Sequence, residues 1–391
     1  MNDTSPHRMA LSGIRVLDDH TLQITIDSPK PYFLAKLTHP VAFVVDGENV
    51  AQGGGIWYKD PNGTGPFRLE RWEAGSRLIL AADEGHYGGA PGLDQVVFVL
   101  DAPSLFTLYE QGKLDAVPVG VADIERVLDP NNPLNRELSE VEILGTYYIG
   151  LNVSAPPFDD LRVRQAFHMA IDRDKLANVV YKKMAEPAKG ILPPGFPGYD
   201  PELEGLPYDP ARARQLLAAS RYGGAEGLPP IVLLVAGEGA SPRRTVEAVY
   251  DMYLRNLGVE LQIQQMGWAD YLGALRQEER DFQMFGVDTG WIADYPDPEN
   301  FLDVLFHSGS GENRTGYASE QVDRLLERAR TESDPHARLA LYREVERILV
   351  KDSPWIPLTH DVEQWLTKPY VHGMIYAGMQ VPHLKYVSVS R

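Results

Sequence analysis

The sequence predicts an α/β protein built from two lobes. Its 391 residues are more than one ordinary hydrophobic core requires. Strand patterns dominate up to about residue 150, whereas helix and strand patterns alternate from about residue 156. We therefore expect a discontinuous β-rich lobe formed by residues 1–155 and 361–391, and an α/β lobe formed by residues 156–360.

The β-rich part begins with a predicted hairpin, because apolar residues alternate on either side of a polar turn. These residues are Ile14, Val16, Leu22, Ile24 and Ile26. Further strands are expected at FRLERW (67–72), SRLILAAD (76–83), LDQVVFVLD (93–101) and TYYIGLNV (146–153). A helix is expected between Pro103 and Gly112, since glycine commonly follows the last turn of a helix.

The α/β part contains a run of alternating strands and helices. Strands expected at 231–236, 259–266 and 281–287 are separated by helices expected at 242–258 and 268–277. Successive strands joined by a helix usually lie parallel, with right-handed connections. We therefore expect a parallel sheet in this part of the chain.

Start signals predict the remaining helices. Asp209 and Asp334 are expected N-caps, because each precedes a proline that suits the first helical position. Ser319 is expected to begin another helix. Asp159 or Asp160 caps a further helix, and the sequence leaves both open. The apolar stripe of that helix consists of Val163, Ala166, Phe167, Ala170 and Ile171.

The composition limits the possible functions. The formal net charge is −18 and basic residues are not concentrated in one segment, so we expect no nucleic-acid partner. No apolar run is long enough to cross a bilayer. The chain has no cysteine, which excludes disulfides, thiolate catalysis, cysteine-bound zinc and lipid attachment through a cysteine. Residues 1–13 lack the basic start and apolar segment of a signal peptide, so we expect none in this sequence.

The segment GVDTGWIADYPDPENFL (286–302) is the main candidate for a binding site. It follows the expected strand at 281–287, and ligands of open parallel sheets bind beyond the carboxyl ends of strands. Trp291 and Tyr295 offer flat apolar faces beside three carboxylates, those of Asp288, Asp294 and Asp297. The alternative interpretation is a loop in which Trp291 covers the core and the acids are solvated.

Catalytic signatures are nearly absent. The tripeptide Asp288-Thr289-Gly290 matches the one that carries the catalytic carboxylate of aspartic proteases. Those enzymes need two carboxylates that share a proton, and this chain has no second such tripeptide. Signatures of zinc proteases, serine hydrolases and phosphate-binding loops are missing, and DYPDPEN (294–300) lacks the spacing of a calcium loop. We expect a protein that is not an enzyme and binds no metal or cofactor.

Several blocks of the sequence together resemble a known family. They include NGTGPFRLERWEAGSRLILAADEGHYG (62–88), YIGLNVSAPPFDDLRVRQAFHMAIDRDKL (148–176), YDPARARQLLAAS (208–220) and GWIADYPDPENFL (290–302). The chain resembles the family 5 extracellular solute-binding proteins, the dipeptide- and oligopeptide-binding components of ABC importers. The resemblance extends in family order from about residue 12 to the C-terminus.

The resemblance implies a two-lobed periplasmic-binding-protein clamshell, of type II and the peptide-binding cluster. Family members usually carry an export signal, often a lipidated cysteine, and further residues that form the first strands of lobe I and a small extra domain. This sequence lacks a counterpart of that portion, so we expect a lobe I remnant. The implied role is to capture short peptides outside the cytoplasm, at the membrane, and to deliver them as a monomer to ABC transporter permease subunits.

The resemblance also implies site residues. In peptide-binding members, the acid of the Gly-Trp-x-x-Asp segment binds the α-ammonium group of the peptide, and the matching residue is Asp294. The other expected ligand contacts are Gly290, Trp291, Ala293 and Tyr295. Alternatives remain: the same family with another solute (a nickel complex, haem, an opine or an oligosaccharide), a truncated remnant that binds no ligand, and, more distantly, an aspartic-type hydrolase.

Overall fold

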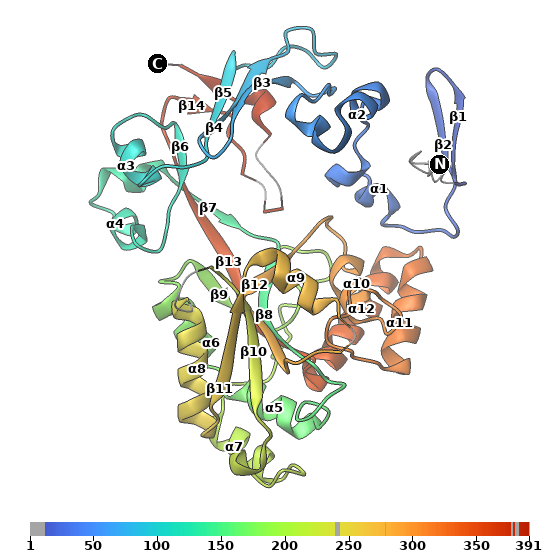
Figure 1. Ribbon diagram of the computed structural model, residues 1–391, viewed down its shortest axis with the longest axis vertical. Coiled ribbons are helices and arrows are strands. Elements are labelled where there is room, and N and C mark those ends of the chain that lie inside the picture. The colour runs from blue at the N-terminus through green and yellow to red at the C-terminus, as the bar shows by residue number, and fades with distance from the viewer. Residues whose placement is uncertain (1–11, 239–242, 278, 377, 380–382, 391) are drawn as a thin grey trace, which may run out of the picture.

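The computed structural model describes residues 12–238, 243–277, 279–376, 378–379 and 383–390. The elements form two groups, one at each end of the long strand β13 (Trp355–Thr367), as Figure 1 shows. Helices and strands are mixed, which confirms the predicted α/β class. The expectation of no signal peptide, and the predicted helix start at Pro242, concern residues outside the described ones.

Strands occur in both groups of elements. They are β1 (Ile14–Asp18), β2 (Thr21–Ile24), β3 (Phe67–Glu73), β4 (Arg77–Ala82), β5 (Gln95–Val99), β6 (Ala116–Pro118), β7 (Leu138–Glu142), β8 (Gly145–Leu151), β9 (Ala185–Pro187), β10 (Ile231–Ala236), β11 (Leu261–Met266), β12 (Met284–Ile292), β13, β14 (Val371–His372) and β15 (Ser388–Val389).

Helices surround the sheets, and none in the described part of the chain is both long and apolar enough to cross a membrane. They are α1 (Phe33–Lys36), α2 (Gly47–Gly53), α3 (Leu105–Glu110), α4 (Ile124–Leu128), α5 (Leu161–Met169), α6 (Arg173–Lys175), α7 (Pro210–Ala218), α8 (Arg244–Leu257), α9 (Trp268–Leu275), α10 (Val304–Phe306), α11 (Glu320–Thr331) and α12 (Pro335–Asp352).

The central sheet has the strand order β11-β10-β12-β8-β13-β6. Strand β10 pairs in parallel with both β11 and β12, as the alternating pattern predicts. Strand β8 pairs antiparallel with both β12 and β13, so the sheet as a whole is mixed. Strand β13 continues beyond β8 and pairs antiparallel with β7 and β6. One strand therefore belongs to both groups of elements.

The predicted helix caps are confirmed. Asp209 accepts a hydrogen bond from Arg212 N, and Asp334 accepts one from Ala337 N. Ser319 caps α11 in the same way. Of the two candidates for the cap of α5, Asp160 accepts from Arg162 N, whereas Asp159 forms an ion pair with Arg221.

The predicted end of the third parallel strand is wrong. The sequence predicts a strand at 281–287, but β12 covers Met284–Ile292 and still pairs with β8 at Gly290. The register shifts between Gly286 and Gly290, where Gly286 (φ 107°) and Val287 (φ 75°) adopt positive φ. Such a bulge bends a strand without ending it. Residue periodicity does not reveal it, because the extra residue interrupts the alternation.

Two hydrophobic clusters cover opposite faces of the central sheet. Leu233 and Val235 of β10 belong to the cluster that packs on α5, α7 and α8. Leu234 belongs to the cluster that packs on α9, α11 and α12. Since neighbouring residues of a strand point to opposite faces, this alternation places helices on both sides of the sheet.

The amino-terminal residues form smaller units. The hairpin β1–β2 is present as predicted, and β3, β4 and β5 form an antiparallel sheet. A third hydrophobic cluster joins α3 and α4 to the end of β13. The expected lobe boundary at residue 155 falls after β8, although β8 is bonded between β12 and β13 in the central sheet. The division into lobes stays a prediction.

Candidate ligand-binding site

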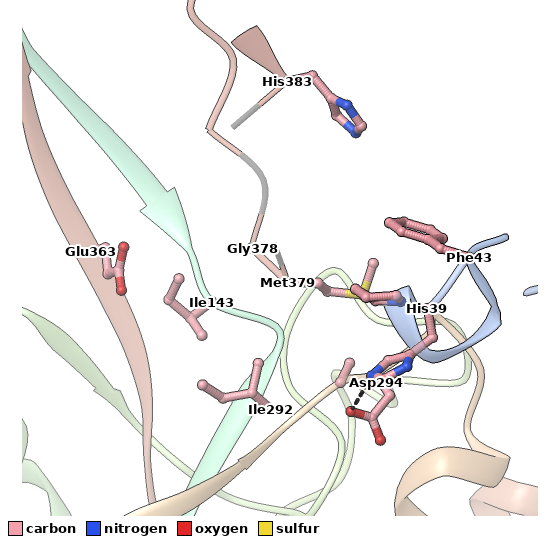
Figure 2. Close-up of a pocket in the computed structure, with 11 residues that line it drawn as sticks. His39, Phe43, Ile143, Ile292, Asp294, Glu363, Gly378, Met379 and His383 are labelled. Atoms are coloured by element: carbon pink, nitrogen blue, oxygen red, sulfur yellow. Dashed lines mark ion pairs between the residues drawn. The ribbon is translucent and has the colours of Figure 1, made fainter. Parts of the chain in front are cut away.

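A cavity of about 780 Å³ lies at the carboxyl end of β12. Its lining comes from segments that are far apart in the sequence (Figure 2). These residues are His39, Pro40, Phe43, Ile143, Ile292, Ala293, Asp294, Glu363, Gly378, Met379 and His383. Most of them are apolar, and the ionisable ones are two acids and two histidines. An apolar cavity of this size with a few polar groups is typical of a small-ligand site.

Asp294 lies two residues after the end of β12, and the buried side chain of Asn300 holds it in place. The Asn300 oxygen accepts a hydrogen bond from Asp294 N (2.9 Å), and the Asn300 amide donates one to Asp294 Oδ2 (3.2 Å). The indole N–H of Trp291 donates to the same Asn300 oxygen (3.3 Å). The Asp294 side chain remains 45% exposed, and its Oδ1 lies 3.5 Å from Nε2 of His39.

An ion pair fixes the loop that carries Asp294. Arg338 on α12 donates hydrogen bonds of 2.8 and 2.6 Å to the carboxylate of Asp297, and both side chains are almost completely buried. The hydroxyl of buried Tyr295 donates to Glu299. Removing one partner of a buried ion pair leaves an uncompensated charge, so this pairing strongly disfavours other loop conformations.

Tyr32 and Lys36 join the amino-terminal elements to α12 and to this loop. Tyr32 is 4% exposed, and the guanidinium carbon of Arg338 lies 5.3 Å from its ring centre. Lys36 Nζ lies 3.0 Å from Glu299 Oε1 and 5.2 Å from the ring centre of Tyr295. These contacts place the residues that follow α1, residues 39–43, beside the cavity.

The predicted ligand contacts fall into two groups. Ala293 and Asp294 line the cavity. Trp291 packs against the cluster under α9, α11 and α12, and Tyr295 lies beneath Lys36, so neither belongs to the lining.

Gly290 has a structural reason to be glycine. A Cβ added there would lie 2.9 Å from the carbonyl oxygen of Thr146 and 3.1 Å from the ring of Tyr147, both on β8. The close approach of β12 to β8 therefore requires a residue without a side chain. Ligand contact by Gly290, as by the other predicted residues, stays a prediction.

The sequence reasoning missed much of the cavity. His39, Glu363, Met379 and His383 line it, but each lies far along the chain from the segment 286–302. No spacing or local motif links these residues to Asp294. The pairing of β7 and β13, a hydrogen bond from Leu144 N to the carbonyl oxygen of Gly378, and the contacts of Tyr32 and Lys36 bring distant segments of the lining together.

Asp288, within β12, lies at a second cavity of about 490 Å³, at the carboxyl end of β10. Its lining is Ala236, Gly237, Glu238, Arg243, Trp268, Asp288 and Thr289. Burial raises the pKa of Asp288, although a hydrogen bond from Thr245 and the charge of Arg243 oppose this effect. In the described part of the chain, Oδ2 of Asp288 has no hydrogen-bond partner. Within the described residues, Oδ2 of Asp288 therefore shares no hydrogen bond with Glu238, the other acid of this cavity.

No metal centre is found within the described residues, where no three acidic or histidine side chains are grouped to hold an ion.

Comparisons with known proteins agree on one family. The family model of bacterial extracellular solute-binding proteins, family 5 Middle, matches residues 2–313. The chain is similar to Di/tripeptide-binding protein 2 of Pseudomonas aeruginosa, with 28% identity over 372 residues, covering 92% of this chain and 68% of that protein. It is also similar to the periplasmic oligopeptide-binding protein OppA of Escherichia coli, with 29% identity, covering 94% of this chain and 67% of that protein.

Solved structures give the same result. The murein tripeptide binding protein MppA of Escherichia coli superposes with a TM-score of 0.81 and 27% identity, covering 96% of this chain and 74% of that one. The predicted family resemblance and clamshell fold are thereby confirmed. The chain spans about two thirds of the length of the curated relatives it matches.

Proposed function

Because the chain belongs to the bacterial extracellular solute-binding proteins of family 5, we propose that it captures short peptides and delivers them to the permease subunits of an ABC transporter. Relatives named as di-, tri- and oligopeptide-binding proteins support peptides over the other solutes considered. The role places the protein outside the cytoplasm, as the description of its family states.

The observation that carries this proposal is the position of Asp294. It presents a half-exposed carboxylate at the wall of a mostly apolar cavity. The α-ammonium group of a peptide is a compact cation with several N–H donors, and a charge-assisted hydrogen bond to a carboxylate contributes about 1.5–3 kcal/mol. The apolar walls accept side chains of varied shape, because hydrophobic burial is not directional.

The free edge of β12 suits the main chain of a peptide. Strand β12 pairs with β10 only at Met284 and Phe285, whereas its other edge pairs with β8 as far as Ile292. On the β10 side, the backbone of residues 287–292 has no strand partner among the described residues. An extended peptide can add to such an edge through main-chain hydrogen bonds, which do not depend on its sequence. In this proposal the peptide lies along β12 with its ammonium group at Asp294.

Asp294→Asn tests the proposal directly. The substitution keeps the shape of the side chain but removes its charge, so we expect peptide binding about tenfold to a hundredfold weaker, with little change in stability. Isothermal titration calorimetry with trialanine measures the effect. N-acetyl-trialanine, which lacks the ammonium group, should bind the parent and the variant equally.

Glu363→Gln is the matched control, because Glu363 is the other acid of the cavity lining. It should retain most of the affinity for trialanine. If Asp294→Asn binds trialanine as tightly as the parent does, Asp294 is not the ammonium site.

We also propose that the protein does not hydrolyse the peptides it binds. The support is that the Asp-Thr-Gly aspartate, Asp288, lies at the second cavity and its Oδ2 shares no hydrogen bond with another carboxylate in the described part of the chain. Peptides incubated with the protein should remain intact by mass spectrometry. Reproducible cleavage that is lost in Asp288→Ala would contradict this.

A further inference from the structure

The carboxylate proposed to bind the ligand already faces a cation-forming side chain of this chain. Nε2 of His39 lies 3.5 Å from Oδ1 of Asp294, and Figure 2 marks this contact. His39 comes from the turn after α1, whereas Asp294 follows β12. The two residues therefore approach the cavity from different groups of elements.

The position of His39 is determined by its neighbours. Its Nδ1 accepts a hydrogen bond from Val41 N (3.2 Å), which caps the short 3-10 turn Pro40–Ala42. Since Nδ1 accepts, the neutral ring carries its proton on Nε2, the atom that faces Asp294. The contacts of Tyr32 with Arg338 and of Lys36 with Glu299 hold this segment against the cavity.

Other ionisable groups near this contact already have a partner or lie elsewhere on the cavity lining. Lys36, on the same segment, forms an ion pair with Glu299. Glu363 lines the cavity from β13 and accepts a hydrogen bond from the indole of Trp365. His383 also lines the cavity, but no ion pair of His383 is found among the described residues.

We propose that His39 competes with the ammonium group of the ligand for Asp294, so that the protein binds peptides more weakly when His39 is protonated. This inference rests on the function proposed above, because it assigns a regulator to the same site. A protonated imidazole both neutralises Asp294 and repels an incoming ammonium group. Both effects act in the same direction.

Histidine side chains change charge between about pH 5 and 8, whereas carboxylates of ordinary pKa remain ionised at pH 5.5. The ammonium group of a peptide remains mostly charged up to about pH 7. Lowering the pH from 7.0 to 5.5 therefore adds positive charge to histidine side chains in general, while carboxylates and the ammonium group of the ligand change little.

The experiment is calorimetric titration of the full chain with trialanine at pH 5.5 and pH 7.0. Exposed ion pairs have modest energies, so we expect the parent to bind about two- to fivefold more weakly at pH 5.5. The variant His39→Asn should bind trialanine equally well at both pH values. Asparagine retains an acceptor for Val41 N, since it is a favoured N-cap, but cannot become charged. His39→Gln provides a second neutral variant if His39→Asn unfolds at a lower temperature.

His383→Asn is the matched control, because His383 lines the same cavity without pairing with Asp294. It should keep the pH dependence of the parent. N-acetyl-trialanine should show no weakening at pH 5.5, since it has no ammonium group for His39 to oppose. Comparing each variant with the parent also cancels the effect on binding of other buried groups that titrate in this range, such as Glu346 and Asp361.

The two proposals fail in different ways. If the parent and His39→Asn show the same weakening at pH 5.5, the competition is wrong while peptide binding stands. If trialanine and other short peptides bind neither protein at either pH, peptide capture itself is wrong, and the competition with it.

Discussion

Glu346 on α12 is a buried acid that serves as a structural acceptor. Its Oε1 accepts hydrogen bonds from Ile191 N (2.7 Å) and Leu192 N (2.8 Å), and Oε2 has no partner within the described residues. A Cβ at Gly190 would lie 2.5 Å from Oε1, so glycine is needed for this approach. Burial raises the pKa of Glu346 to about 7, with a further contribution from Asp200, while the two N–H donors and Arg347 oppose the shift.

The raised pKa of Glu346 makes a testable change in stability. Between the ordinary pKa of 4.5 and about 7, the folded protein binds a proton at Glu346 that the unfolded chain has released. The free energy of unfolding therefore falls as the pH rises through this window and then levels off. Glu346→Gln has no proton to lose, so it should be more stable than the parent by about 2–3 kcal/mol at pH 8 and similar to it at pH 4.

Denaturant unfolding at the two pH values measures this difference. Glu344→Gln is the control, since Glu344 lies on the same helix but is exposed. Equal pH dependence in Glu346→Gln and the parent would show that Glu346 is not the group responsible.

Within the central sheet, β8 and β12 fit together through one glycine and one aromatic ring. Gly150 on β8 is paired with Phe285 on β12, and a Cβ at Gly150 would lie 2.1 Å from Cζ of that ring. Phe285 is fully buried and packs edge-on against Tyr148 (6.2 Å between ring centres). The ring occupies the space above the glycine, so the two strands depend on this pair for their packing.

Gly150→Ala should destabilise the protein by about 2–3 kcal/mol, because the added methyl group forces a buried ring or a paired strand to move. Thermal or denaturant unfolding measures the change. Gly273→Ala on α9 is the opposite case: nothing lies within 4 Å of its added Cβ, and alanine favours helix by about 0.5–1 kcal/mol. If both substitutions have the same effect, the packing of Phe285 on Gly150 is not limiting.

At the scale of the whole molecule, two kinds of connection join the groups of elements seen in Figure 1. One is covalent, because the continuous strand β13 belongs to both groups. It pairs first with β8 and then with β7 and β6. The other is the docking of Tyr32 on Arg338 of α12 and of Lys36 on Glu299, in the loop that follows β12. We propose that these groups are the two lobes of the clamshell, with β8 assigned to the lobe of the central sheet rather than separated from it at residue 155.

Tyr32→Ala should release the docked segment without unfolding the central sheet. Hydrogen exchange of amides in residues 33–43 should become faster, while β10 keeps its protection, because local opening reports local contacts. At pH 7.0, trialanine should bind more weakly, since Pro40 and Phe43 lose their positions on the cavity wall. Tyr87→Ala is the control, because Tyr87 is 88% exposed. Unchanged exchange in residues 33–43 would mean that Tyr32 is not the anchor.

The sequence by itself determined the features that depend on neighbouring residues. The parallel strands β10, β11 and β12 follow from alternating apolar segments, and the caps Asp209, Ser319 and Asp334 follow from side chains that reach backbone N–H groups a few residues away. The sequence also predicted that the segment 286–302 follows a parallel strand, although it ended that strand at 287 and not at Ile292.

Only the tertiary structure decided which distant segments meet. Strand β12 continues past the bulge at Val287 and includes Trp291. The burial of Tyr295 under Lys36 keeps that ring out of the cavity lining. The meeting of His39 with Asp294, 255 positions later in the chain, depends on packing between segments that share no local pattern. Side-chain burial and strand register select such contacts, and both are properties of the assembled fold.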